Sequence, residues 1–275
     1  MAGLVITHNM MADTALRNLT AVYAALAKSI NALSSGLRIN GAADDAAGLA
    51  FREMMRASVA ALDQGVRNAN DAISMLQTFD GAAQVIDEKL IRMKELAMQA
   101  ATGTYSTSQR TIMNNEFSAM RDEITRIANA TSFNDISGLN SSGTIKIHFG
   151  AGNSSAADYY YVNMQDMTAT ALGIGSLSIA TQASAQGALG TVDTAIGTKD
   201  TARANFGAMI NRLHNTVSNL QIQRENTQAA ESQISDVDVA AEMAKLTRNQ
   251  VLARTAVAML VQANTIPMMA TTLLG

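Results

Sequence analysis

Residues 44–101 read DDAAGLAFREMMRASVAALDQGVRNANDAISMLQTFDGAAQVIDEKLIRMKELAMQAA, and this segment predicts the central helix of the fold. Its apolar side chains recur every three or four residues over roughly six heptads, the pattern of one long helix with a narrow apolar seam. The seam consists of Met55, Val59, Leu62, Val66, Ala69, Ile73, Leu76, Phe79, Ala83, Ile86, Leu90, Met93 and Ala97. At about 1.5 Å per residue, the predicted helix is about 85 Å long. Its seam therefore needs partners of similar length.

Turn-forming residues bound this helix. Gly36 and Gly41 predict a break before it, and residues 102–104 (TGT) predict its end. Asp44 and Asp45 are expected to cap its first turn, because a carboxylate there accepts from free backbone N–H groups and meets the positive end of the helix dipole. A metal or acid–base role for this pair is the weaker alternative, since no histidine lies near.

Four further segments have helical spacing. They are residues 15–37, 106–127, 189 to about 232, and 239 to near Pro267. The third of them is apolar along its seam except at Lys199 and Arg203. The last is expected to stop near Pro267, because proline cannot donate to a helical ladder.

A small β element interrupts the helices. Residues 144–149 (TIKIHF) alternate, residues 150–153 suit a turn, and residues 158–164 (DYYYVNM) are rich in strand-forming aromatics. His148 is expected to be an exposed strand residue, and residues 168–190 a loop with short strands. The predicted fold is mainly α: a long antiparallel, coiled-coil-like helical rod with a β-hairpin element around 140–180 and a terminal helix pair.

The composition suits thin helical seams. Hydrophobic residues make up 48% of the 275 residues, with 17 methionines, 4% aromatics and no tryptophan. The net charge of −3 gives no reason to expect nucleic acid or an anionic membrane as partner, and no apolar run is long enough for membrane insertion. The first ten residues lack the features of a secretory signal, and the absence of cysteine excludes disulfides and thiol chemistry.

No catalytic motif is present. The sequence has no phosphate-binding glycine loop, no histidine pair at helical spacing and no nucleophile elbow. We therefore expect no enzyme activity, no cofactor and no metal site.

The two ends of the chain carry more apolar side chains than a two-helix coiled coil can hide. Residues 4–6 with Met10 and Met11, and residues 251–252 and 257–261, form this excess. Such helices gain burial from neighbouring copies, and a head-to-tail contact that does not close produces a helical filament. An ordinary four-helix bundle with apolar ends is the alternative. The candidate assembly residues are Leu19, Val22, Leu26, Ile30, Leu33, Met243, Leu246, Val257, Leu260 and Val261.

Several blocks of sequence resemble bacterial flagellin. Residues 33–40 (LSSGLRIN) and 43–48 (ADDAAG) resemble its amino-terminal signature, and residues 67–74 (RNANDAIS) its next block. Residues 262–264 (QAN), with the closing Leu273 and Leu274, resemble its carboxy-terminal helix. The resemblance covers roughly residues 1–135 and 185–275, and the large outer variable domain of long flagellins is missing.

The resemblance implies a structural subunit of the flagellar filament that assembles with itself for swimming motility. Residues 1–40 and 236–275 would form a terminal helical domain lining the filament core, and residues 41–235 a surrounding rod domain. The protein would be secreted through the flagellar type III apparatus to the extracellular filament. Its implied partners are other copies of itself, the flagellar cap protein, hook–filament junction proteins and an export chaperone.

The resemblance also extends to a patch that Toll-like receptor 5 recognises in some flagellins. Residues 90–99 (LIRMKELAMQ) match that motif, which places candidate receptor contacts at Arg92, Leu96, Gln99 and Glu116. By spacing, Arg92 and Gln99 lie off the seam and Leu96 lies beside it. The alternative is an ordinary solvated helix face.

Two other functions remain open at the sequence level. A hook–filament junction protein shares helical ends with flagellin. A cytoplasmic coiled-coil adaptor would instead form a stable oligomer of fixed size with ordered termini.

Overall fold

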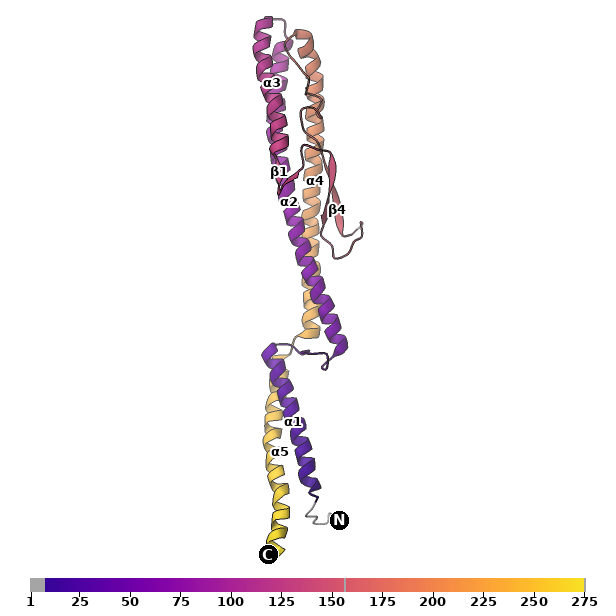
Figure 1. Cartoon of the computed structure of the whole chain (residues 1–275), viewed down its shortest axis with the longest axis vertical. Coiled ribbons are helices and arrows are strands. Elements are labelled where there is room, and N and C mark those ends of the chain that lie inside the picture. Colours follow the sequence, from indigo (N-terminus) through magenta and orange to yellow (C-terminus); the bar gives the residue numbers. More distant parts are fainter. Residues whose placement is uncertain (1–7, 156, 275) are drawn as a thin grey trace. The chain divides into compact units, whose positions relative to one another are not determined.

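The computed structural model describes residues 8–155 and 157–274, which fold into five helices and two antiparallel two-stranded sheets (Figure 1). The helices are α1 (Met10–Ser35), α2 (Ala46–Ala101), α3 (Thr107–Ala130), α4 (Gln182–Ser235) and α5 (Val239–Leu274). Strand β1 (Ser132–Phe133) pairs with β2 (Ile136–Ser137), and β3 (Gly143–His148) pairs with β4 (Tyr159–Met164). The predicted mainly α fold is confirmed, while the apolar residues 4–6 lie outside the described residues.

The chain divides into two compact units. Unit 1 comprises residues 1–57 and 226–275, and unit 2 comprises residues 58–225. The long helices α2 and α4 each contribute residues to both units. No helix among the described residues is both long and apolar enough to cross a membrane.

Unit 2 is built around α2, α3 and α4, which lie side by side (Figure 1). The predicted α2 seam is buried from Leu62 to Ala97, apart from the half-buried Val66. Large side chains from the other two helices, among them Phe117 and Phe206, join the same core. The pattern of threes and fours therefore predicted part of the buried face of α2, and Ala72, Met75 and Leu96 are buried beside it.

Ion pairs connect α2 and α4 along their length. Arg224 pairs with Asp63 at 3.0 Å, and Arg203 pairs with Asp80 at 2.7 Å. The buried ammonium of Lys199 lies against Asp87 and Asp200. As the residue numbers fall along α4 they rise along α2, so the two helices are antiparallel. Lys199 and Arg203, the two polar positions of the predicted α4 seam, form ion pairs with carboxylates on α2.

The β3–β4 hairpin packs its apolar face on the unit 2 core. Ile147, Val162 and Met164 are buried there. His148 is half-buried and not fully exposed as expected, because its cross-strand partner Tyr159 stacks on it with ring centroids 6.1 Å apart.

Two predicted boundaries are wrong. Helix α4 begins at Gln182, not Leu189, and no strand forms in residues 168–181. The small residues there suggested a loop, but Ala185 and Ala188 are buried in the core, and this burial outweighs the low helix propensity of the glycines. Helix α5 continues through Pro267 to Leu274.

Candidate functional site

In unit 1, α1 and α5 form an antiparallel pair (Figure 1). On both helices, the positions that are buried or half-buried recur every three or four residues, which is the spacing of a two-helix coiled coil. On α1 the positions with this spacing are Ala12, Ala15, Leu19, Val22, Leu26, Ser29 and Leu33, and the buried Ala32 lies beside Leu33. On α5 they are Glu242, Leu246, Asn249, Ala253, Ala256, Leu260 and Ala263. Each helix therefore buries one narrow stripe against the other.

Two polar contacts define the register of this pair. The Ser29 hydroxyl donates to Glu242 Oε1 at 2.7 Å, and Asn9 Nδ2 donates to the carbonyl of Ala263 at 2.9 Å. The Glu242 carboxylate also accepts from Lys245 Nζ at 2.9 Å. The hydrogen bonds from Lys245 and then Ser29 hold the pKa of Glu242 below its ordinary value. A polar pair inside an apolar seam selects one alignment of the helices.

The contact at Ala263 explains why Pro267 does not end α5. A proline at position 267 has no N–H to donate to the carbonyl four residues earlier, which is that of Ala263. Asn9 supplies the missing donor from the other helix, and its Oδ1 also caps α1 by accepting from Ala12 N at 3.1 Å. The prediction of a stop near Pro267 considered only the local ladder and missed this distant partner.

The outward faces of the pair are strongly apolar. Met10 is 76% exposed, and Tyr23 and Ile30 are about half exposed. Other exposed large apolar side chains of the pair are Met11, Leu16, Val239, Met243, Val251, Leu252, Val257, Met259 and Val261. A groove of about 590 Å³ lies between the two helices beside Met10, Met11 and Met259. Apolar surface of this extent marks an interaction site.

The predicted assembly residues fall into two groups in the structure. Six are half-buried in the α1–α5 seam: Leu19, Val22, Leu26, Leu33, Leu246 and Leu260. Four point to solvent: Ile30, Met243, Val257 and Val261. The candidate set lacked Leu16 and Tyr23, although the seven-residue spacing of Leu16, Tyr23 and Ile30 was a readable signal for a second stripe.

The candidate receptor residues lie in unit 2. Arg92 Nε donates to Glu116 Oε1 at 2.8 Å, which joins α2 to α3, and Gln99 Nε2 donates to the Tyr105 hydroxyl at 2.9 Å. Leu96 is only 2% exposed, so the expectation that it flanks the seam at the surface is wrong. Helix α2 packs against α3 as well as α4, and its buried stripe is therefore wider than that of a two-helix seam.

Comparison with known proteins covers nearly the whole chain. Residues 6–144 match the bacterial flagellin N-terminal helical region, and residues 189–274 match the bacterial flagellin C-terminal helical region. The chain is 40% identical over 265 residues to a flagellin of Halalkalibacterium halodurans, covering 96% of this chain and 97% of that protein. It is 38% identical over 275 residues to the flagellar filament 31.3 kDa core protein of Treponema maltophilum, covering 95% and 96%.

A solved structure agrees with these matches. The crystal structure of Bacillus cereus flagellin superposes with a TM-score of 0.51 at 33% identity, covering 60% of this chain and 94% of that chain. The chain is therefore a member of the bacterial flagellin family, a structural and non-enzymatic subunit of the flagellar filament.

Proposed function

We propose that the α1–α5 pair is the part of this flagellin that builds the filament, through contacts between its outward apolar faces in successive copies. The exposure of large apolar side chains on both helices carries this proposal. At about 25 cal/mol per Å² of apolar area, a few hundred Å² buried in each contact supplies several kcal/mol. A repeated contact that does not close generates a helical assembly.

In this proposal the terminal segments 1–40 and 236–275 line the filament core, and residues 41–235 form the surrounding rod domain. The flagellar cap protein, hook–filament junction proteins and an export chaperone are proposed as further partners. Family membership supports them, because a filament subunit has to be exported, capped and joined to the hook.

Electron microscopy of seeded assembly tests the proposal. The intact chain is expected to form long tubes on sheared fragments of its own filament, and a chain lacking residues 1–30 and 240–275 is expected to form none. A discrete oligomer of fixed size from both chains would contradict the proposal and favour a coiled-coil adaptor.

A pair of point variants separates the outward face from the seam. Tyr23→Ser with Ile30→Ser removes exposed apolar area without touching the seam, so assembly is expected to weaken while helix content is kept. The matched control is Thr20→Ser with Asn31→Ser, two exposed polar positions on the same helix. Equal assembly of the two variants would argue against a role for this stripe.

A second proposal is that the monomer activates Toll-like receptor 5 through the surface of Arg92, Gln99 and Glu116. The ion pair between Arg92 and Glu116 favours it, because it presents two candidate contacts from different helices as one surface. Buried Leu96 would support this surface by packing and not by direct contact.

Receptor reporter cells test this second proposal. Arg92→Ala and Glu116→Ala are each expected to reduce signalling, whereas Arg126→Ala is not. Arg126 is the control because it is an exposed arginine of α3 whose carboxylate partner, Glu123, lies on its own helix. Unchanged signalling by the first two variants would reject the proposal.

A further inference from the structure

The two connections between helices in unit 1 lie side by side. One connection joins α1 to α2 and the other joins α4 to α5. Leu37 and Asp236 form an antiparallel bridge, with Arg38 N donating to the carbonyl of Ser235 at 2.7 Å and Val237 N to that of Gly36 at 3.0 Å. Chain segments nearly 200 residues apart are therefore hydrogen-bonded backbone to backbone.

The Arg38 side chain adds a second tie between the connections. Its Nε and Nη2 both donate to the carbonyl of Ile234, at 3.1 and 2.7 Å. Ile234 lies in the last turn of α4, where carbonyls lack a donor within the helix and carry the negative end of the helix dipole. The end of α4 is thus capped by a cation from the amino-terminal connection.

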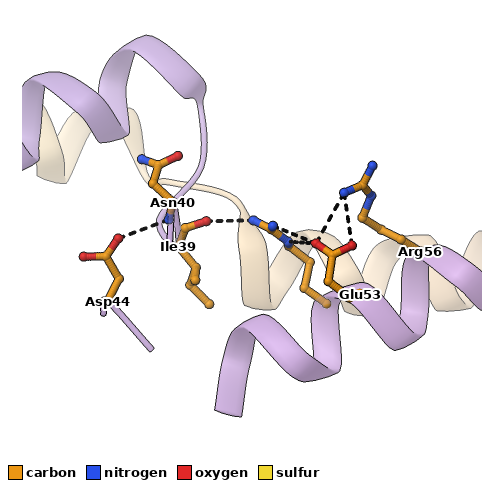
Figure 2. A network of polar contacts seen from close by, with 6 residues as sticks. Ile39, Asn40, Asp44, Glu53 and Arg56 are labelled. Atoms are coloured by element: carbon orange, nitrogen blue, oxygen red, sulfur yellow. Dashed lines mark hydrogen bonds and ion pairs between the residues drawn. The ribbon is translucent and has the colours of Figure 1, made fainter. Parts of the chain in front are cut away.

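The residues next to Arg38 are anchored to the start of α2 (Figure 2). Ile39 is fully buried, and its carbonyl accepts from Arg52 Nη1 at 2.7 Å. Arg52 is held by Glu53, which also pairs with Arg56. The backbone N–H of Asn40 donates to Asp44 Oδ2 at 3.2 Å.

Asp45 and Gly48 complete this anchor. Asp45 caps α2 by accepting from Gly48 N at 2.8 Å. A Cβ on Gly48 would come within 2.4 Å of Asp45 Oδ2 and 2.6 Å of Ile39 Cδ1, so the glycine leaves room for both side chains. Asp44 also pairs with Lys28 of α1 at 2.8 Å. Most polar side chains of residues 34–48 (SSGLRINGAADDAAG) thus form a hydrogen bond or an ion pair.

We infer that residues 36–48 form a clasp that holds both helix connections together, with Arg38 as its positioning residue. Gly36, at φ 72°, and Gly41 both lie in the connection between α1 and α2. Without the clasp, these glycines would leave that connection free to move by itself. With the clasp closed, neither connection opens without the other. The clasp lies within one chain and does not depend on which surfaces make the assembly contacts.

Hydrogen exchange followed by mass spectrometry tests the clasp in assembled filaments. Each variant of the full chain is labelled with ¹⁵N and added as a minor component to wild-type filaments, so that its peptides are distinguished by mass. In Arg38→Ala, the backbone amides of residues 38 and 237 are expected to exchange about tenfold faster, and both together, because they make the two bridge hydrogen bonds. Arg38→Lys, which keeps the charge but not the two-armed contact, is expected to fall between Arg38→Ala and wild type.

Arg17→Ala is the matched control, because Arg17 is an exposed arginine of the same unit whose hydrogen bond, to Thr14 Oγ1, lies within its own helix. It is expected to leave both amides at the wild-type rate, and residues 19–26 of α1 are expected to stay protected in every variant. Faster exchange at only one connection, at neither, or throughout α1 would overturn the clasp. If Arg38→Ala does not enter filaments, Arg38→Lys provides the measurement with the same criteria.

Discussion

At the scale of single residues, two close approaches position the β3–β4 hairpin on α2. The face of Gly65 lies against the backbone carbonyl of Phe149, where a Cβ would overlap the oxygen. Three residues further along α2, Asn68 Nδ2 donates to the carbonyl of His148 at 2.9 Å. The turn end of the hairpin therefore touches the α2 backbone, which only a glycine permits.

Gly65→Ala is expected to lower the free energy of unfolding by about 1–3 kcal/mol, because the hairpin backbone has to move away. Gly81→Ala is the control in the same helix, since nothing lies within 4 Å of its added Cβ. It is expected to raise stability by about 1 kcal/mol through helix propensity. Urea denaturation of both variants checks this, and a shift in the same direction for both would contradict it.

Asn9 and Pro267 form a second residue-scale pair. Asn9→Ala removes a helix cap and leaves the Ala263 carbonyl without its donor, so we expect a loss of about 1–2 kcal/mol. In a Pro267→Ala background the restored amide can bond that carbonyl, and Asn9→Ala should then cost less. A double-mutant cycle on assembled filaments, followed by thermal denaturation, measures the coupling. Additive losses would disprove the link between the two residues.

At the scale of helices, buried charged residues and their ion-pair partners lie within seams that are otherwise apolar. Lys199 is 1% exposed between α2 and α4, and Glu242 is 9% exposed between α1 and α5. A buried charge is tolerated only with its partners in place, so each pair favours one register over its neighbours. The amphipathic pattern brings the helices together, and the charges select their alignment.

Asp87→Ala is expected to destabilise unit 2 by about 2 kcal/mol, because Lys199 then keeps only Asp200 as a carboxylate partner. Lys199→Met removes the buried charge at similar volume and is expected to stay within about 1 kcal/mol of wild type. Lys199→Met leaves Asp87 without its lysine partner, but the Asp87 carboxylate is partly exposed to solvent, and this exposure limits the loss of stability. Chemical denaturation would refute this if Lys199→Met proved the more damaging change.

The α1–α5 pair is expected to weaken in acid. The pKa of Glu242 is lowered from its ordinary 4.5 by Lys245, Ser29 and the nearby Lys28, so the folded state binds fewer protons than the unfolded state. The resulting stability is present above about pH 4.5 and is lost as the pH falls below it. Helix content followed from pH 7 to 3 by circular dichroism should show this loss.

Glu242→Gln tests whether protonation of Glu242 causes the loss of stability in acid, because the glutamine amide does not titrate. The variant is expected to be less stable than wild type at pH 7 and to approach it at pH 3. Glu231→Gln, on α4, is the control and should follow the wild-type curve. A constant difference between Glu242→Gln and wild type across the range would contradict the assignment.

At the scale of the whole molecule, the two units differ in how much they bury. Unit 2 has a continuous apolar core drawn from three helices and the hairpin, whereas the α1–α5 pair of unit 1 buries one narrow stripe. Family membership confirms the sequence-based prediction of a flagellar filament subunit without enzyme activity. Unit 1, which has the smaller buried core, also carries most of the exposed large apolar side chains of the described residues.

Trypsin is therefore expected to cut the monomer first in α1 and α5, at sites such as Arg17, Lys28, Arg248 and Arg254, and to spare residues 58–225. In filaments the same sites are expected to be protected by neighbouring copies. Gel electrophoresis with mass spectrometry of the fragments follows both reactions. Equal cleavage of monomer and filament, or first cuts within unit 2, would count against terminal assembly.

Local patterns in the amino-acid sequence were enough to predict the helical class, part of the buried face of α2, the break at Gly36, the β-hairpin and the family. Heptad spacing, turn residues and motif blocks are local signals, and neighbours along the chain suffice to read them. They did not reveal the early start of α4 at Gln182, because a run of small residues is helical only where a core covers it.

Packing between distant segments determines which apolar residues of α1 and α5 face each other and which face outward. It also determines that Leu96 is buried, that Lys199 and Arg203 answer Asp87 and Asp80, and that α5 passes Pro267. Each of these outcomes depends on a partner that is distant in sequence. Helical periodicity specifies a face of a helix, but the burial and hydrogen bonding of that face depend on what packs against it.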